Sequence, residues 1–292
     1  MTSVSDILHR VKQGKLTIAE AEKLLRLDAI AIIGDVARVD TARHLRRGVP
    51  EIIFAASKTA RQLSLIVTEL LQRRSSEPLG ADLELSAPGI IISKIRDRNQ
   101  IKSITRSIND FNRTHVTKFG LAYHGEAQIA VINRKETLHH HQRKKGSENG
   151  KVALLAAGTS DIPVLSEAEI VLNEMNVKTI RFNDVGVAAL HRLSAPMKKI
   201  VTFEPDAIIV AAGMEGALPS VVAGLSSVPV IGLPTSVGYG LGGRGESALM
   251  SMLQACPLGM SVVNIDAGVA AGVVAYLIAK TASRHSSRSA SE

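Results

Sequence analysis

Val152-Ala-Leu-Leu-Ala-Ala-Gly-Thr-Ser-Asp161 decides the fold of the larger part of this chain. Its first five residues form a continuous apolar run, which is typical of a strand buried on both faces of a sheet. The polar turn that follows leads into a helix expected to end near Asn173. Further strands, each followed by a turn and a helix, are predicted at 177–182, 207–211, 228–232 and 260–265. This alternation predicts an α/β domain at 151–280 with a doubly wound parallel sheet, whose ligands bind beyond the carboxyl ends of its strands.

Residues 1–134 predict a smaller α+β domain with leading helices. We expect two short helices within 5–26, where Thr17 and Glu20 form a capping box, and a basic helix at 40–47. A longer helix is predicted at 59–73 from the spacing of its apolar residues. The predicted strands of this domain are 51–55, 89–93, 120–124 and 128–132.

A polar, glycine-containing run at 135–150 predicts a linker between the two domains. It contains three consecutive histidines, His139, His140 and His141, which could bind a metal or belong to a solvated linker. We favour the linker, because adjacent histidines do not share one face of a helix. Residues 281–292 are polar and are predicted to form a disordered tail.

The composition limits the compartment and the partners. A single cysteine among 292 residues excludes an intrachain disulfide framework and favours a reducing compartment. The first residues lack the pattern of a signal peptide and no apolar run is long enough to cross a bilayer, so we expect a cytoplasmic protein without a membrane partner. The net charge of +8 suits phosphate-bearing small molecules as well as nucleic acid.

Aromatic residues make up only 3% of the chain, which is too few for platforms that stack single-stranded bases. We therefore expect no nucleic-acid partner. A basic nucleotide- or RNA-binding protein remains the non-enzymatic alternative, and it predicts a salt-sensitive affinity for nucleic acid without a reaction product.

The candidate functional residues come directly after predicted strands. Gly158, Thr159, Ser160 and Asp161 offer hydroxyls and free backbone N–H groups that can hold a phosphate. The alternative is that Ser160 or Asp161 simply caps the helix that follows.

Two titratable residues, Asp184 and His191, follow the second strand of the α/β domain. Asp184 could orient a substrate hydroxyl, act as an acid or base, or cap the next helix. His191 could act as an acid or base because imidazole titrates near neutral pH, or it could be a structural histidine.

Glycines surround the remaining candidates. Glu215 lies in a tight turn between glycines, where the backbone can approach a ligand and a carboxylate has little structural purpose. A later loop, with the pattern Gly238-x-Gly240-x-x-Gly243, formally matches a dinucleotide fingerprint. That fingerprint belongs after the first strand of its fold, so we interpret the loop as a cover for the substrate. The substrate-binding candidates in these two segments are Gly213, Met214, Gly216, Ser236, Gly238 and Gly240.

Cys256 is the lone thiol, at the end of a predicted helix that follows the glycine-rich loop. A thiol at the rim of a phosphate site is a candidate nucleophile, whereas an isolated cysteine is otherwise a small buried hydrophobe. We take Cys256, Glu215, Asp184 and His191 as the candidate catalytic residues.

Several of these motifs resemble the AIR carboxylases and mutases of purine synthesis, which have the PurE fold. The motifs are Gly158-Thr-Ser-Asp161, Ala189-Leu-His-Arg192 and Met252-Leu-Gln-Ala-Cys-Pro257. The resemblance implies a flavodoxin-like domain of three layers. Cys256 before the late proline, and Glu215 in place of an alanine–histidine pair, depart from the pattern of the purine enzymes.

The chain resembles the LarB family more closely, the pyridinium-3,5-biscarboxylic acid mononucleotide synthases of nickel-pincer cofactor biosynthesis. The similar segments are 157–164, 184–188, 212–220, 234–240 and 262–266, with further similarity upstream at 37–58. This resemblance implies carboxylation of nicotinic acid adenine dinucleotide at C5 of its pyridinium ring by CO2 or bicarbonate. It also implies hydrolysis of the phosphoanhydride, which releases AMP.

The resemblance implies a role for each candidate. Cys256 would add to the ring at C4, and Glu215 or His191 would remove the ring proton. The ribose and phosphate would be held by Ser160, Asp161 and Asp184. Arg43, Arg46 and Lys58 could hold phosphates or dock the N-terminal domain.

The resemblance also implies a substrate-associated Mg²⁺, no tightly bound organic cofactor, and a homo-octamer of PurE type. The alternative activity is that of a 5-aminoimidazole ribonucleotide carboxylase or mutase, which needs no thiol.

Overall fold

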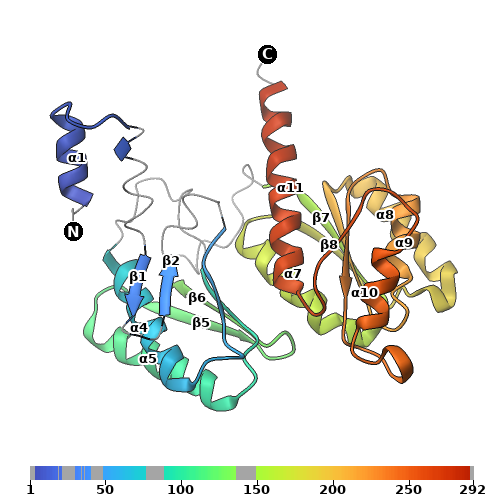
Figure 1. Cartoon of the computed structure of the whole chain (residues 1–292), viewed down its shortest axis with the longest axis horizontal. Coiled ribbons are helices and arrows are strands. Elements are labelled where there is room, and N and C mark those ends of the chain that lie inside the picture. Colours follow the sequence, from blue (N-terminus) through green and yellow to red (C-terminus); the bar gives the residue numbers. More distant parts are fainter. Residues whose placement is uncertain are drawn as a thin grey trace. The chain divides into compact units, whose positions relative to one another are not determined.

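Two units make up the part of the chain that the computed structural model describes, which is residues 4–18, 20–21, 30–33, 35, 37–40, 49–76, 89–135 and 149–289 (Figure 1). Unit 1 is residues 1–123 with 130–141, and unit 2 is residues 124–129 with 142–292. Most of the predicted linker, including His139, His140 and His141, lies outside the described residues, as do Arg43 and Arg46 with the basic helix expected around them.

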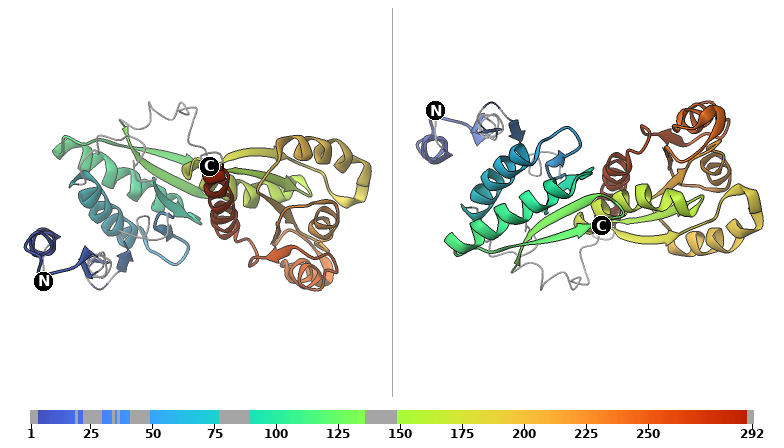
Figure 2. Two further views of the ribbon diagram at one scale, coloured as in Figure 1. Left: turned by 90° about the horizontal axis from the view of Figure 1, so that it is seen from above. Right: turned by 90° about the horizontal axis from the view of Figure 1, so that it is seen from below.

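Unit 1 contains a four-stranded sheet in the order β3-β4-β6-β5. β3 (Ile52–Phe54) is parallel to β4 (Ile90–Ser93), which pairs antiparallel with β6 (Ile129–Arg134), and β5 (Phe119–His124) forms the edge. The helices α4 (Ala60–Ser76) and α5 (Arg98–Thr114) run side by side over the strands (Figure 2). Their apolar faces join strand residues such as Ile92 in one core. The α+β class predicted for this half is confirmed.

Two elements of unit 1 were not predicted from the sequence, and one prediction is confirmed. The helix α5 was not predicted, although Asp97 and Gln100 form a capping box at its start and its buried residues recur at helical spacing. The hairpin of β1 (Ile30–Ile33) and β2 (Ala37–Asp40) is a second addition. The first helix, α1, is confirmed at Val4–Lys12.

The capping box predicted at Thr17 is confirmed. The Thr17 N–H donates to Glu20 Oε2 at 2.9 Å, and the Glu20 N–H donates back to Thr17 Oγ1 at 3.2 Å. The Thr17 hydroxyl also donates to Glu20 Oε2, at 2.8 Å. The bond from the Thr17 backbone, and after it the bond from the Thr17 hydroxyl, lower the pKa of the Glu20 carboxyl.

Unit 2 is built on a five-stranded sheet in the order β11-β10-β9-β7-β8, in which every pair is parallel. The strands are β7 (Lys151–Ala156), β8 (Lys178–Phe182), β9 (Ala207–Ala212), β10 (Val230–Pro234) and β11 (Met260–Val262). Its helices are α7 (Ile162–Glu174), α8 (Ser194–Phe203), α9 (Leu218–Leu225), α10 (Glu246–Leu253) and α11 (Gly268–Ser289). The predicted doubly wound parallel sheet is confirmed.

Helices cover both faces of the sheet in unit 2, which gives three layers. α8, α9 and α10 supply residues such as Ile200, Val222 and Met252 to a core with inward residues of β7 and β9. α7 and α11 pack against each other and against β7 and β9. They cross closely, because a Cβ on Gly268 would lie 2.2 Å from the Val164 carbonyl oxygen and one on Gly272 would lie 2.8 Å from that of Ala168.

Two helix ends in unit 2 differ from the prediction. α10 ends at Leu253, so Cys256 lies in the loop that follows it. α11 continues to Ser289, so residues 281–289 are helical where a disordered tail was expected. The hydroxyls of Thr281 and Ser283 donate to the carbonyls of Leu277 and Lys280, so these two side chains do not interrupt the helix. None of the helices among the described residues is long and apolar enough to cross a bilayer.

The contact between α7 and α11 gives a stability prediction. Gly272→Ala should destabilise the protein by about 1–3 kcal/mol, although alanine is the better helix former, because the new methyl meets the Ala168 backbone. Gly224→Ala in α9 is the matched control, since nothing lies within 4 Å of its added methyl, and a gain of up to about 1 kcal/mol is expected. Urea unfolding measures both, and equal stabilisation by the two substitutions would contradict the close crossing.

Candidate functional site

The carboxyl edge of the sheet in unit 2 gathers the turns that the sequence singled out. Because the strands are parallel, the segments after β7, β8, β9 and β10 all emerge at this edge. The turn after β7 forms the short helix η2 (Thr159–Asp161), and Thr159 and Ser160 are exposed there. Their hydroxyls and the start of α7 are therefore open to a ligand.

Asp161 ties three of these turns together. Its side chain is buried, with 4% of the residue exposed. Oδ2 accepts from the Gly158 N–H at 2.8 Å, and Oδ1 accepts from the hydroxyl of the fully buried Thr235 at 2.5 Å. The Gly213 N–H also bonds the carboxylate. The Asp161 oxygens are thus engaged inside the protein, and Asp161 shapes the turns that would hold a ligand.

The surroundings of Asp161 act on its pKa in opposite directions. Burial raises the pKa of the Asp161 carboxyl above its ordinary 3.8, and the negative charge of Asp266 adds to the rise. Hydrogen bonds from Thr235, Gly158 and Gly213 stabilise the charged form and limit the increase.

Left-handed backbone recurs where strands end at this edge. Asp184, Met214 and Asp266, which follow β8, β9 and β11, have φ angles of 56°, 51° and 55°. Such a conformation costs a non-glycine residue roughly 1–3 kcal/mol, so the surrounding contacts must hold it. One such contact is the 2.8 Å bond from the Ser236 N–H to Asp266 Oδ1, and another is the 2.9 Å bond from the Asp266 N–H to the Pro234 oxygen.

The turn after β9 presents Glu215. Gly213 lies so close to the next turn that a Cβ would be 2.1 Å from the Val237 oxygen, and the Met214 N–H donates to that oxygen at 2.9 Å. Gly216 has a φ of +62° and lies against α10. This fixed backbone leaves the Glu215 side chain exposed.

Asp184 is paired with a neighbouring cation. Arg192 Nη1 donates to Asp184 Oδ2 at 2.7 Å, and both side chains are partly exposed. Arg192 and His191 lie on the helix η3 (Val187–Leu193), with His191 exposed. The pair engages one oxygen of the Asp184 carboxylate and one nitrogen of the Arg192 guanidinium. Arg192, Thr235 and Asp266 were not among the candidate residues predicted from the sequence. Asp266 follows a strand, as the predicted candidates do, and this position was the available signal for it.

Cys256 lies at the opposite end of the strands, which is the amino edge of the sheet. Met260 pairs with Val230, the first residue of β10, and the Val230 N–H donates to the Gly259 oxygen at 3.0 Å. The loop that carries the exposed Cys256 is therefore at the amino edge. At about 3.3 Å per residue, β10 separates this loop from the carboxyl edge by roughly 15 Å. Cys256 follows the glycine-rich loop in the sequence, which suggested that both lie at the same rim. Within one chain, α10 runs from the carboxyl edge to the amino edge and separates the two.

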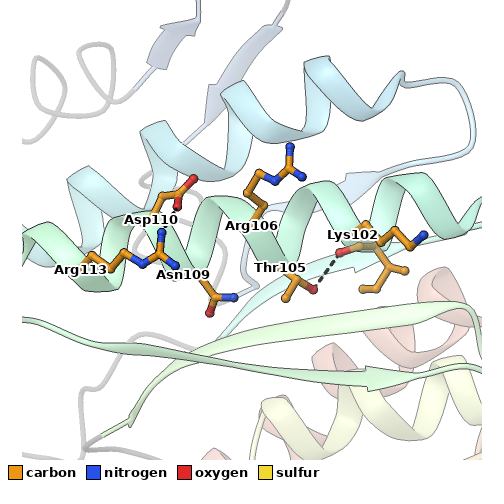
Figure 3. A pocket seen from close by; sticks show the side chains of 7 residues that line it. Lys102, Thr105, Arg106, Asn109, Asp110 and Arg113 are labelled. Carbon is orange, nitrogen blue, oxygen red and sulfur yellow. Dashed lines mark hydrogen bonds and ion pairs between the residues drawn. The ribbon is translucent and has the colours of Figure 1, made fainter.

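A cationic hollow of about 500 Å³ lies on the outer face of α5 in unit 1 (Figure 3). It is lined by one helix, through Ile101, Lys102, Thr105, Arg106, Asn109, Asp110 and Arg113. Asp110 is paired with Arg113 at 3.2 Å, and the Thr105 hydroxyl donates to the Ile101 oxygen at 2.8 Å. The hollow is an open shelf on one helix, and its carboxylate, Asp110, is already paired with Arg113.

Within the described ranges, no three histidine, cysteine or acidic residues gather in a way that could hold a metal ion. At the carboxyl edge, Asp184 is paired with Arg192 and Asp266 holds the Ser236 N–H. These residues do not fit a metal site in which the protein supplies all the ligands. They are compatible with a Mg²⁺ that arrives on a diphosphate, since Mg²⁺ commonly binds through substrate phosphates and water.

Comparisons with known proteins match both halves of the chain. Residues 151–291 match the AIR carboxylase family model, and residues 31–81 match the LarB/PurE-like N-terminal domain. The uncharacterized protein MJ0165 of Methanocaldococcus jannaschii is 34% identical over 95% of this chain and 97% of its own length. The N5-carboxyaminoimidazole ribonucleotide mutases of M. jannaschii and Pyrococcus abyssi are each 31% identical, over 44% of this chain and 77% and 72% of their own lengths.

The bond between Thr235 and Asp161 gives a second stability prediction. Thr235→Val keeps the shape but removes the donor, so a buried carboxylate oxygen loses its partner at a cost of about 1–3 kcal/mol. Thr235→Ser keeps the hydroxyl and loses one methyl, at about 1 kcal/mol. Denaturant unfolding of the two variants tests this, and a serine variant less stable than the valine variant would refute it.

The raised pKa of Asp161 predicts a pH dependence. As the pH rises from 3.8 to the folded pKa, the native state keeps a proton that the unfolded state has lost. The free energy of unfolding therefore falls with rising pH over this interval because of Asp161. Asp161→Asn should lack this fall. The stability of the wild type minus that of the variant, measured across the interval, should decrease as the pH rises, and a rising difference would reverse the assignment.

Proposed function

Because the chain belongs to the LarB/PurE-like family, whose chemistry is of the carboxylase or mutase type, we propose that it is a pyridinium-3,5-biscarboxylic acid mononucleotide synthase. Its substrate is nicotinic acid adenine dinucleotide, which it carboxylates at C5 and hydrolyses to release AMP. The observation that carries the proposal is the joining of the two matched domains in one chain. The mutase relatives match only 44% of this chain, whereas the relative with both halves aligns over nearly all of it.

A thiol solves the chemical difficulty of this reaction. A pyridinium ring is too electron-poor to attack CO2. A thiolate that adds at C4 converts the ring into a dihydropyridine, whose C5 is a carbon nucleophile. C5 attacks CO2, a base removes the C5 proton, and the electron pair expels the thiolate and restores the aromatic ring. The thiol is regenerated, so no tightly bound organic cofactor is required, and exposed Cys256 is the thiol of the chain.

The thiol reaches the carboxyl edge from a second copy of the chain. Within one chain, the sheet separates Cys256 from Glu215. The loop of Cys256 is flanked by Leu253 and Leu258, which are 64% and 94% exposed. Apolar side chains gathered around a nucleophile are typical of a surface that another subunit covers. The homo-octamer implied by the resemblance would supply that subunit.

The carboxyl edge supplies the other groups. Glu215 and His191 are exposed there and remain the alternative bases for the C5 proton. The diphosphate is assigned to the hydroxyls of Thr159 and Ser160 and the backbone at the start of α7; the exposure of both residues supports this assignment. Asp161 acts by holding this turn, and Asp184 by its pair with Arg192. Mg²⁺ bound to the diphosphate would offset its charge during hydrolysis.

The second candidate is the mutase or carboxylase activity on 5-aminoimidazole ribonucleotide. The similarity of unit 2 to the mutases of M. jannaschii and P. abyssi favours it. That chemistry needs no thiol, so Cys256 distinguishes the two candidates.

The direct test incubates the protein with nicotinic acid adenine dinucleotide, labelled bicarbonate and Mg²⁺. Mass spectrometry should detect AMP and a dicarboxylated pyridinium mononucleotide that carries the label. Cys256→Ala and Cys256→Ser should abolish carboxylation while circular dichroism stays unchanged. An unchanged dinucleotide, with turnover of aminoimidazole ribonucleotides by wild type and Cys256→Ser alike, would establish the second candidate.

Delivery of the thiol from a second copy is tested by mixing inactive subunits. Cys256→Ala should be inactive alone, and so should Glu215→Gln where Glu215 is the base. Co-expressed, they form sites that combine Glu215 of one subunit with the thiol of the other, so up to about a quarter of wild-type activity should return. Absence of activity in a mixed oligomer, with Glu215→Gln confirmed inactive, would rule out delivery between subunits.

A further inference from the structure

The segment between Val237 and Gly245 carries two exposed apolar side chains at the carboxyl edge of unit 2. Tyr239 is 81% exposed and Leu241 is fully exposed. Exposed apolar surface beside a candidate site is a common place for a ligand to bind. Tyr239 and Leu241, two residues apart, offer such a surface here.

The ends of this segment are fixed to the site. The Val237 oxygen accepts from the Met214 N–H at 2.9 Å, which joins the segment to the turn of Glu215. Gly245 is buried with a φ of +83°, and a Cβ there would lie 2.8 Å from the Thr235 oxygen. Tyr239 is thus anchored beside the turn that presents Glu215.

The part of the segment around Tyr239 borders open space, whereas Gly242 further along packs against Ser247. Gly240, next to Tyr239, has a φ of +69°, and nothing lies within 4 Å of the place that a Cβ would take on it. Gly238 and Gly240 on either side of Tyr239 allow backbone conformations that other residues rarely adopt. A ring on such a segment can turn toward a ligand while the ends stay in place.

Among the phenylalanine and tyrosine residues that the structure describes in unit 2, Tyr239 is the exposed one. Phe182 and Phe203 are partly buried, and Tyr276 is only 3% exposed. A Tyr face is electron-rich and attracts cationic and electron-poor rings.

We propose that Tyr239 stacks on the pyridinium ring of the substrate and positions it at the carboxyl edge. This inference rests on the proposed function and adds a residue that recognises the ring. A ring stacked on Tyr239 offers its opposite face to the thiol that adds at C4. Tyr239 is a substrate-positioning residue, and the adenine end of the dinucleotide does not occupy it.

The chain has no tryptophan, so Tyr239→Trp creates a single fluorescent reporter. Nicotinic acid mononucleotide carries the pyridinium alone, and AMP carries the adenine alone. We expect saturable quenching of the emission by the mononucleotide and by the intact dinucleotide, but none by AMP. Tyr123→Trp, at a partly exposed position in β5 of unit 1, is the control and should show no saturable quenching.

Kinetics supply a second readout. Tyr239→Ala should raise KM for the dinucleotide by roughly ten- to a hundredfold, the range that loss of a stacked base gives. Tyr239→Phe keeps the ring and should recover most of the lost affinity. Gel filtration with light scattering should show the same oligomer for all three proteins.

Three results would overturn the inference. Quenching by AMP but not by the mononucleotide would assign the ring to adenine. An unchanged KM for Tyr239→Ala would remove the stacking role. Loss of the oligomer in Tyr239→Ala would make a second copy the occupant. Each can be obtained while the wild type still carboxylates the dinucleotide, so each is distinguishable from failure of the proposed function, which the product assay on the wild type reports.

Discussion

The buried hydrogen bond between the Thr235 hydroxyl and the Asp161 carboxylate is the interaction on which the edge of unit 2 depends. It joins the turn after β7 to the turn after β10, and the Gly213 N–H brings in the turn after β9. A carboxylate taken out of water is costly unless donors surround it, so its donors and their turns are held in one arrangement. The exposed groups, Ser160 and Glu215, are presented on this fixed frame.

The parallel sheet imposes a second constraint on the chemistry. Every strand of unit 2 points the same way, so acids, hydroxyls and backbone donors gather at the carboxyl edge. The loop before β11 leaves Cys256 at the amino edge. A reaction that uses both edges requires two copies of the chain, which makes assembly part of the proposed active site rather than an addition to it.

Much of unit 2 could be predicted because its signals are local. The strands β7 and β9 are apolar runs ended by glycine-bearing turns, and these features need no distant partner to be recognised. Unit 1 was less predictable. The hairpin of β1 and β2 is short, and short strands gain their stability from packing that the sequence does not display. The α5 helix does have a local signal, the capping box of Asp97 and Gln100, so its absence from the prediction has no such physical reason.

The sequence by itself determined the parallel α/β class and the positions after strands where functional residues lie, because hydrophobic periodicity and turn chemistry act between near neighbours. Only the tertiary structure decided how those residues are buried, paired and placed. It buried Asp161 against Thr235, paired Asp184 with Arg192 and put Cys256 at the opposite edge from Glu215. Asp161 and Thr235 are 74 positions apart. The place of Cys256 depends on the direction in which α10 returns across the sheet, which no local pattern encodes.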